Sequence, residues 1–313
     1  MTTPNRLPPA SIVDRRDFLK LAGAAAVAGS LAAHPRTNSM AAESSSKPGL
    51  KKAVKASMVK FEGTHLERFQ MLKEAGFDGI DMDSYDRKDR DALAQASEKS
   101  GLLIHGVVYG QSWRTRFTSP DAAQREAALA GLSAAIEDCK FWGGNTVLVI
   151  PGVVDQENYY DEVWDRSLET LKKALPVAEK HEVYISLENV WNNFLVSPVE
   201  MAYFIDEFKS PWVKAYFDVG NCMRYGWPEQ WARALGQRII KLDIKEFSTK
   251  KMNEEGLYKG FVDLWDGDVN WKAVMDEMRA LDYTDGWGTA EIAGGGRERM
   301  VEIAEKMDRI YAA

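Results

Sequence analysis

The sequence has 313 residues and a formal net charge of −7, from 40 Lys and Arg against 47 Asp and Glu. A chain this acidic repels a phosphate backbone, so the composition argues against nucleic acid as a partner. The two cysteines, Cys139 and Cys222, are interpreted as free thiols, because a domain of this size does not need a disulfide.

The first part of the chain has the features of an export signal. Arg15-Arg16 precedes an apolar, Ala-rich run over residues 21–33, which is too short to span a bilayer. The arginine pair resembles a twin-arginine signal. We predict that residues 1–42 form a twin-arginine-type signal peptide, read by the export machinery, and that the mature chain is periplasmic or otherwise exported. The alternative is a buried N-terminal helix.

Beyond the leader, residues 43–52 are small and polar and predict a linker. Short apolar runs then alternate with longer amphipathic segments. The runs predict strands at 54–59, 79–83, 102–107, 146–150, 183–188, 213–218, 239–244 and 288–292. The longer segments predict helices at 66–75, 122–140, 161–180, 198–208 and 271–281, among others.

Eight strands separated by helices indicate parallel βα units, and the count of eight favours a closed barrel. No Gly-x-Gly-x-x-Gly follows the first strand, which argues against a dinucleotide fold. We therefore predict an α/β, single-domain (β/α)8 TIM barrel over residues 53–313. No apolar stretch in it approaches the roughly 20 residues of a transmembrane helix, so we do not expect stable membrane insertion.

An acidic residue occurs at the end of each of the last four predicted strands. Side chains alternate along a strand, and the apolar neighbours of these acids would face the helices. The acids would then face the barrel axis at its C-terminal end, where barrels of this kind carry their chemistry. The four positions are Glu188, Asp218, Asp243 and Glu291.

Four converging carboxylates would repel one another and raise each other's pKa. A divalent cation removes this conflict, and oxygen ligands suit Mg²⁺ or Mn²⁺. The alternative for any single acid is a structural ion pair, for which Lys241 and Lys245 have the matching strand parity. Four acids on four consecutive strands favour the metal site.

These residues lie within motifs that resemble the xylose-isomerase-like TIM barrels, a group of sugar and sugar-phosphate isomerases and epimerases. The resemblance covers nearly all of residues 53–310. It rests on the segments Glu-Ala-Gly-Phe-Asp-Gly-Ile at 74–80, Leu-Glu-Asn at 187–189, Phe-Asp-Val-Gly-Asn at 217–221, Lys-Glu at 245–246, Gly-Asp-Val-Asn-Trp at 267–271, Asp-Gly-Trp at 285–287 and Ala-Glu-Ile at 290–292. The acidic charge and the small number of histidines argue against the members with endonuclease activity.

In epimerases of this group, the acids matching Glu188, Asp218 and Glu291 bind one divalent ion, with a histidine on strand seven as the fourth ligand. Here that position is Asp243. An all-carboxylate set favours Mn²⁺ or Mg²⁺, with Co²⁺ or Zn²⁺ as alternatives, because Zn²⁺ prefers nitrogen and sulfur ligands. The resemblance also allows a homo-oligomer.

The resemblance and the acid pair together predict proton transfer at the carbon next to a sugar carbonyl. Glu188 and Glu291 would remove and return the proton on opposite faces of an enediolate, which makes the protein a metal-dependent isomerase or epimerase. A lyase or dehydratase that acts on keto-sugars or keto-glycosides by β-elimination would use the same site. The third alternative, from another class, is a non-catalytic sugar-binding barrel.

Five further residues are candidates for binding a small-molecule sugar substrate. His105 would face the barrel from strand three, or would be a core histidine. Lys245 would hold a substrate oxygen or pair with an acid, and Arg224 lies in the loop after strand six. Trp113 and Trp191, in other strand-end loops, offer flat faces for a sugar ring.

Overall fold

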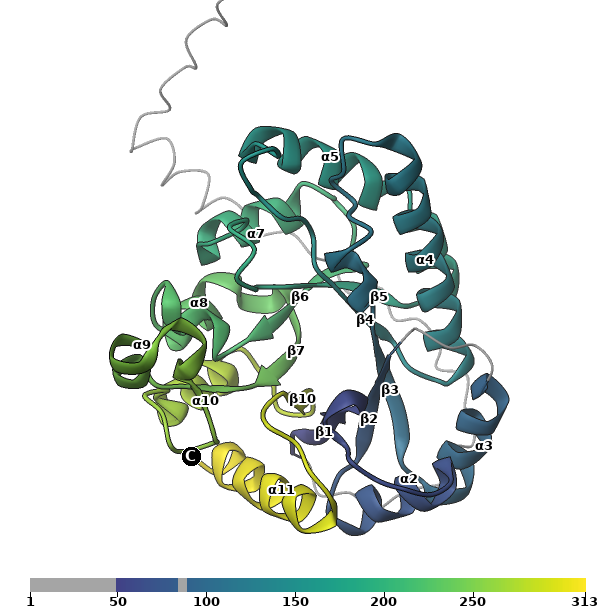
Figure 1. The fold of residues 1–313 in the computed structure, drawn as a ribbon, viewed down its shortest axis with the longest axis vertical. Helices are drawn as coiled ribbons and strands as arrows, with labels where there is room; N and C mark the ends of the chain where they lie inside the picture. Colours follow the sequence, from purple (N-terminus) through teal and green to yellow (C-terminus); the bar gives the residue numbers. More distant parts are fainter. Residues whose placement is uncertain (1–48, 84–88) are drawn as a thin grey trace, which may run out of the picture. The chain divides into compact units, whose positions relative to one another are not determined.

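The computed structural model describes residues 49–83 and 89–313. The predicted signal peptide at 1–42 and most of the predicted linker lie outside these residues. Eight parallel strands close into a barrel in the order β1-β10-β7-β6-β5-β4-β3-β2, with the helices outside the ring (Figure 1). The predicted (β/α)8 barrel is confirmed.

The barrel strands are β1 (Lys51–Lys55), β2 (Gly79–Asp83), β3 (Leu103–Val108), β4 (Thr146–Val149), β5 (Tyr184–Glu188), β6 (Val213–Asp218), β7 (Ile239–Ile244) and β10 (Trp287–Ala290). The helices are α2 (His65–Glu74), α3 (Arg90–Ser100), α4 (Ala122–Phe141), α5 (Tyr160–Lys172), α6 (Leu175–His181), α7 (Pro198–Asp206), α8 (Pro228–Leu235), α9 (Thr249–Glu255), α10 (Trp271–Ala280) and α11 (Arg297–Tyr311). Within the two described ranges, no helix is long and apolar enough to cross a membrane.

The main core lies between the strands and the surrounding helices. Leu187, Phe217 and Leu242, the apolar neighbours of three of the acids, are fully buried there. The Phe217 ring on β6 lies parallel to Trp231 on α8, with the ring centroids 6.5 Å apart. Because side chains alternate along a strand, these outward contacts direct the neighbouring acids toward the barrel interior, as their parity predicts.

Two predicted elements differ from the structure. The first strand was expected at 54–59, but β1 begins at Lys51, whose N–H donates to Gly286 O at 2.8 Å, and it ends at Lys55. Because β1 is rich in lysine, no apolar run marks its start in the sequence. The helix expected at 161–180 is two helices, α5 and α6, because Pro176 in the first turn of α6 has no N–H to continue the bonding of a longer helix.

The segment after β7 departs from a simple βα unit. It forms a two-stranded antiparallel sheet from β8 (Glu246–Phe247) and β9 (Phe261–Val262), with α9 between the two strands. The buried Glu246 carboxylate accepts hydrogen bonds from the N–H groups of Phe247, Trp265 and Val269, each at 3.1 Å, and from Trp271 Nε1 at 2.7 Å. This one side chain therefore fixes the loop to the start of α10.

Candidate metal centre

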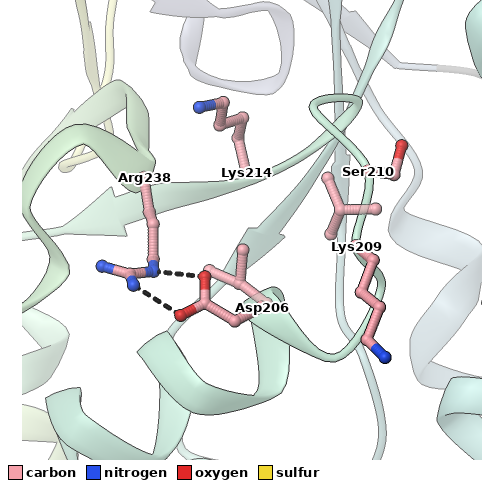
Figure 2. Close-up of a pocket in the computed structure, with 7 residues that line it drawn as sticks. Asp206, Lys209, Ser210, Lys214 and Arg238 are labelled. Atoms are coloured by element: carbon pink, nitrogen blue, oxygen red, sulfur yellow. Dashed lines mark hydrogen bonds and ion pairs between the residues drawn. The ribbon is translucent and has the colours of Figure 1, made fainter. Parts of the chain in front are cut away.

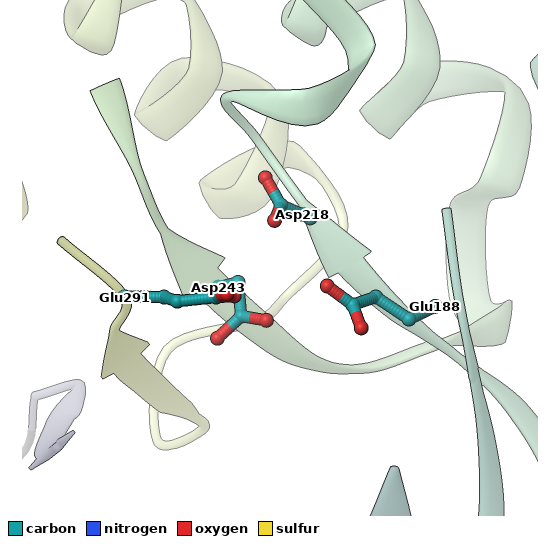
Figure 3. Close-up of side chains that lie close together, drawn as sticks. All are labelled: Glu188, Asp218, Asp243 and Glu291. Atoms are coloured by element: carbon teal, nitrogen blue, oxygen red, sulfur yellow. The ribbon is translucent and has the colours of Figure 1, made fainter. Parts of the chain in front are cut away.

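The four predicted acids meet at the C-terminal end of the barrel. Glu188 and Asp218 are the last residues of β5 and β6, Asp243 lies near the end of β7, and Glu291 directly follows β10. One carboxylate oxygen from each lies within 4.8 Å of the others (Figure 3). Glu188, Asp218 and Asp243 are buried, and the Glu291 side chain is 32% exposed. We call these four side chains the carboxylate cluster.

Two lysines contact the carboxylate cluster. The Lys55 ammonium, at the end of β1, donates to Asp243 Oδ2 at 2.7 Å and to Glu291 Oε2 at 2.6 Å. Lys245 Nζ lies 3.0 Å from Asp218 Oδ2 and 3.2 Å from Glu291 Oε1. Lys245 was among the predicted residues, but Lys55 was missed. The expected strand at 54–59 put Lys55 near its N-terminal end, whereas β1 ends at Lys55 and so brings this side chain to the C-terminal end of the barrel.

The environment separates the acidities of the two glutamates. Burial raises the pKa of Glu188 to about 8; Lys55 opposes this shift, and the charges of Glu291 and Asp218 add to it. Burial also raises the pKa values of Asp218 and Asp243. Burial acts in the same direction on Glu291, but Lys55 and then Lys245 outweigh it and hold the pKa of that carboxyl at about 2.

The carboxylate cluster fits a divalent cation on two observations. The buried oxygen Asp243 Oδ1 has no hydrogen-bond partner among the described residues, and an orphaned buried carboxylate oxygen is costly. With all groups ionised, four carboxylates against two ammonium groups leave two negative charges uncompensated. An oxygen-only set of this charge suits Mg²⁺ or Mn²⁺.

Asp218 is held by a network of two buried asparagines. Its N–H donates to Asn189 Oδ1 at 2.8 Å, and Asn189 Nδ2 donates back to Asp218 O at 2.8 Å. The Asn221 N–H donates to Asp218 Oδ1 at 2.7 Å. The motifs at 187–189 and 217–221 therefore form one unit that orients a ligand carboxylate. Such outer contacts commonly tune a metal site.

Three of the predicted substrate-binding residues form a stack beside the carboxylate cluster. Lys245 Nζ lies 5.0 Å from the centroid of the Phe261 ring, and this ring stacks on Trp191 with centroids 4.7 Å apart. The Arg224 guanidinium lies 5.2 Å from the Trp191 ring. Trp191 Nε1 also donates to Asn221 O at 2.9 Å. Trp113, 43% exposed in the loop after β3, does not belong to this stack.

His105 lies in another layer of the barrel. Its ring stacks on Trp287 at a centroid distance of 3.9 Å. Trp287 begins β10, whereas Glu291 follows the end of that strand, roughly 13 Å away at the usual rise per residue. Burial, followed by the charges of Lys241 and Lys51, holds the pKa of His105 well below its usual value. The structure thus places His105 among core residues and not beside the acids.

A second buried charged group lies inside the barrel. Lys241 pairs with Asp81, which also accepts hydrogen bonds from Tyr216 OH at 2.8 Å and Thr289 Oγ1 at 3.1 Å. Of the two lysines proposed as ion-pair partners of the acids, Lys245 contacts the carboxylate cluster and Lys241 has Asp81 instead. Each of these four polar side chains has a partner within the group, which is typical of a structural polar core.

A pocket at the N-terminal end of the barrel is lined by Ile205, Asp206, Lys209, Ser210, Val213, Lys214 and Arg238 (Figure 2). It lies where α7 ends and where β6 and β7 begin. Arg238 Nε donates to Asp206 Oδ1 at 2.8 Å across it. In barrels of this type the N-terminal face serves stability, so the carboxylate cluster remains the candidate site.

The comparison with known protein families decides the affiliation. Residues 69–312 match the family described as xylose isomerase-like TIM barrel. The chain belongs to this family. The predicted resemblance is thereby confirmed, and the family's fold agrees with the closed eight-stranded barrel described above.

The named relatives within this fold are sugar epimerases. The putative L-ribulose-5-phosphate 3-epimerase SgbU of Escherichia coli K12 is 25% identical over 252 residues, which cover 76% of this chain and 87% of that protein. The structure of the 3-keto-D-glucoside 4-epimerase YcjR from E. coli has a TM-score of 0.70 at 15% identity and covers 84% of this chain and 100% of its own. The structure of the D-psicose 3-epimerase from Clostridium cellulolyticum H10 has a TM-score of 0.68 at 16% identity, and the match covers 83% of this chain and 98% of that one. The predicted enzyme class, isomerase or epimerase of this family, is confirmed at the level of these relatives.

Proposed function

We propose that this protein is a metal-dependent sugar epimerase that moves a proton at the carbon next to a carbonyl group. The observation that carries the proposal is the convergence of four carboxylates, two of them glutamates, within 4.8 Å at the C-terminal end of the barrel. The relatives named above are epimerases of ribulose phosphate, a keto-glucoside and psicose, which supports a keto-sugar as the substrate.

The strand order gives the two glutamates matching positions. β5 and β10 are the outer strands of the arc β10-β7-β6-β5, so Glu188 and Glu291 flank the two aspartates. A substrate carbon above the aspartates would lie between two carboxyl groups, which suits removal of a proton on one face and its return on the other. A bound divalent ion would supply positive charge for the oxygen that becomes negative.

Without a bound ion, the surroundings of the two glutamates already separate their pKa values. Burial raises the pKa of Glu188 to about 8 and so favours its protonated form near neutral pH in the metal-free centre. A pKa of about 2 keeps Glu291 ionised, so that it can accept. Two carboxyl groups whose surroundings separate their pKa values are a common arrangement for an acid and a base.

The test is deuterium exchange from D₂O into ketohexoses, keto-glucosides and pentulose phosphates, followed by mass spectrometry and NMR. We expect the wild-type chain to exchange the proton beside the carbonyl of one of these classes. Glu188→Gln and Glu291→Gln should each lower the rate about 10²–10⁴-fold, the usual contribution of a general acid or base. Glu302→Gln, on the exposed side of α11, is the matched control.

Other outcomes favour other functions. Loss of a β-substituent with formation of a double bond would favour the elimination reaction over epimerisation. Sugar binding without exchange in any substrate class would favour the non-catalytic barrel. Exchange that persists in both glutamine variants would contradict the proposed acid–base pair.

We also propose that the barrel works outside the cytoplasm. The support is the sequence of residues 1–42, with Arg15-Arg16 ahead of an Ala-rich apolar run. A twin-arginine-type route carries folded proteins, so the carboxylate cluster could take up its ion before export.

A further inference from the structure

The two lysines beside the carboxylate cluster neither give nor take a proton in the reaction proposed above. Lys55 comes from β1 and Lys245 directly follows β7, so they approach from separate strands. Both reach Glu291, through different oxygens, at 2.6 and 3.2 Å. Their side chains are only 8% and 13% exposed. Two nearly buried ammonium groups are thus built into a site whose acids are suited to bind a cation.

Both ammonium groups are held in place by aromatic rings. Lys55 Nζ lies 5.6 Å from the ring centroid of Tyr216, and Lys245 Nζ lies 5.0 Å from that of Phe261. Tyr216 is itself fixed by its hydrogen bond to Asp81, and Phe261 by its stack on Trp191. These contacts favour lysines that stay beside the carboxylates over lysines that swing into solvent.

The lysines do not use every oxygen of the carboxylate cluster. Lys55 Nζ donates a hydrogen bond to Asp243 Oδ2, while Oδ1 of the same carboxylate is buried without a hydrogen-bond partner among the described residues. Asp243 Oδ1 is therefore an acceptor that neither lysine uses, and an ion bound to it would experience two fixed positive charges at close range. The repulsion grows in proportion to the charge of the ion.

We propose that Lys55 and Lys245 set the net charge of the centre, so that it binds a divalent cation reversibly and discriminates against trivalent ones. The inference rests on the proposed function, because it assumes that the carboxylate cluster binds a metal. Four carboxylates alone would attract a cation of high charge most strongly. With all four carboxylates ionised, which a bound cation favours, two fixed ammonium groups leave a charge of −2, and one divalent ion neutralises it.

The experiment measures metal affinity, not turnover. The full chain is stripped with a chelator and titrated with MnCl₂ by calorimetry and with TbCl₃ by tryptophan-sensitised luminescence. Lys55→Met and Lys245→Met each remove one positive charge, and Lys55→Arg keeps it. Lys52→Met is the matched control, because Lys52 lies on the same strand and pairs with Asp308 away from the carboxylate cluster. Circular dichroism checks that each variant is folded.

We expect Lys55→Met to bind Mn²⁺ at least about 10-fold more tightly than wild type. Tb³⁺ should then gain at least about 30-fold, since the removed repulsion is half again larger for a trivalent ion. Lys55→Arg and Lys52→Met should bind like wild type. Lys245→Met should show the same gains in Mn²⁺ and Tb³⁺ affinity. If Lys55→Met does not fold, the comparison is made with Lys245→Met instead.

The remaining outcomes separate this inference from the proposed function. If wild type binds Mn²⁺ but both methionine variants bind it equally or more weakly, the lysines only position the acids and the inference is wrong. An equal gain for Mn²⁺ and Tb³⁺ would also overturn it. If only the methionine variants bind metal, the lysines control the charge as inferred, but the metal-dependent function fails. If no variant binds, both fail.

Discussion

At the scale of single residues, Glu188 and Glu291 show how the same carboxyl group acquires opposite properties. Glu188 is buried and forms no ion pair among the described residues, so burial dominates and raises its pKa to about 8. Glu291 is partly exposed and touches both Lys55 and Lys245, so positive charge dominates and lowers its pKa to about 2. The difference arises from two lysines, and neither comes from the strand that carries either glutamate.

The raised pKa of Glu188 predicts a pH dependence of stability in the metal-free protein. Between its unfolded pKa near 4.5 and its folded pKa near 8, the folded state holds a proton that the unfolded state releases, so stability falls as pH rises through this window. Glu188→Gln removes that dependence. We expect the variant to be more stable than wild type at pH 8.5 by about 1–3 kcal/mol, with a smaller difference at pH 5.

The measurement is urea unfolding of both proteins at several pH values in the presence of a chelator. Glu302→Gln serves as the control, since the Glu302 carboxylate is exposed and paired on α11. A stability difference between wild type and Glu188→Gln that stays constant from pH 5 to 8.5 would show that the Glu188 carboxyl does not carry the shift.

At the scale of elements, the loops that follow β5, β6 and β7 are held by hydrogen bonds that also position the side chains of the site. The loop after β6 returns to Asp218 through Asn221, and the loop after β5 does so through Asn189. The loop after β7 is longer, and Glu246 is its anchor, with four N–H donors on one carboxylate. Glu246 directly follows Lys245, so the anchor also positions a lysine of the carboxylate cluster.

Glu246→Gln should loosen this loop without unfolding the barrel. A glutamine amide would direct an NH₂ group at backbone donors, so we expect a loss of about 1–3 kcal/mol, the usual cost of an unsatisfied buried group. Hydrogen exchange should then be faster over residues 246–271 and unchanged in β5 and β6. Uniform acceleration over the whole barrel would mean that Glu246 supports the global fold instead.

At the scale of the whole molecule, the barrel and the predicted signal peptide support separate proposals about function. The family assignment rests on the match over residues 69–312, whereas the export proposal rests on residues 1–42 alone. Because the two proposals rest on separate residues, Arg15→Lys combined with Arg16→Lys should abolish export and leave the deuterium exchange rate of the barrel unchanged. Cell fractionation followed by the exchange assay checks both expectations. Export that persists in the double variant would contradict a twin-arginine route.

Much of the fold and part of the site follow from local patterns. The strands at 79–83, 213–218 and 239–244 lie where their apolar runs predict them. The inward orientation of the acids follows from the two-residue period of a strand, which depends on sequence parity alone. The lysine-rich first strand was misplaced because its stability comes from its pairing with β10 and β2, and no apolar run marks it.

The partners of these side chains were decided only by closure of the barrel. Lys55 and Glu291 are 236 residues apart in sequence and become neighbours because β1 pairs with β10. The same closure brings Lys241 into an ion pair with Asp81. It also stacks the His105 ring on Trp287, away from the acids. Sequence by itself determined which side chains face the interior, because that is a local property of the strand. Tertiary structure determined which charges meet there, because that depends on the order and register of all eight strands.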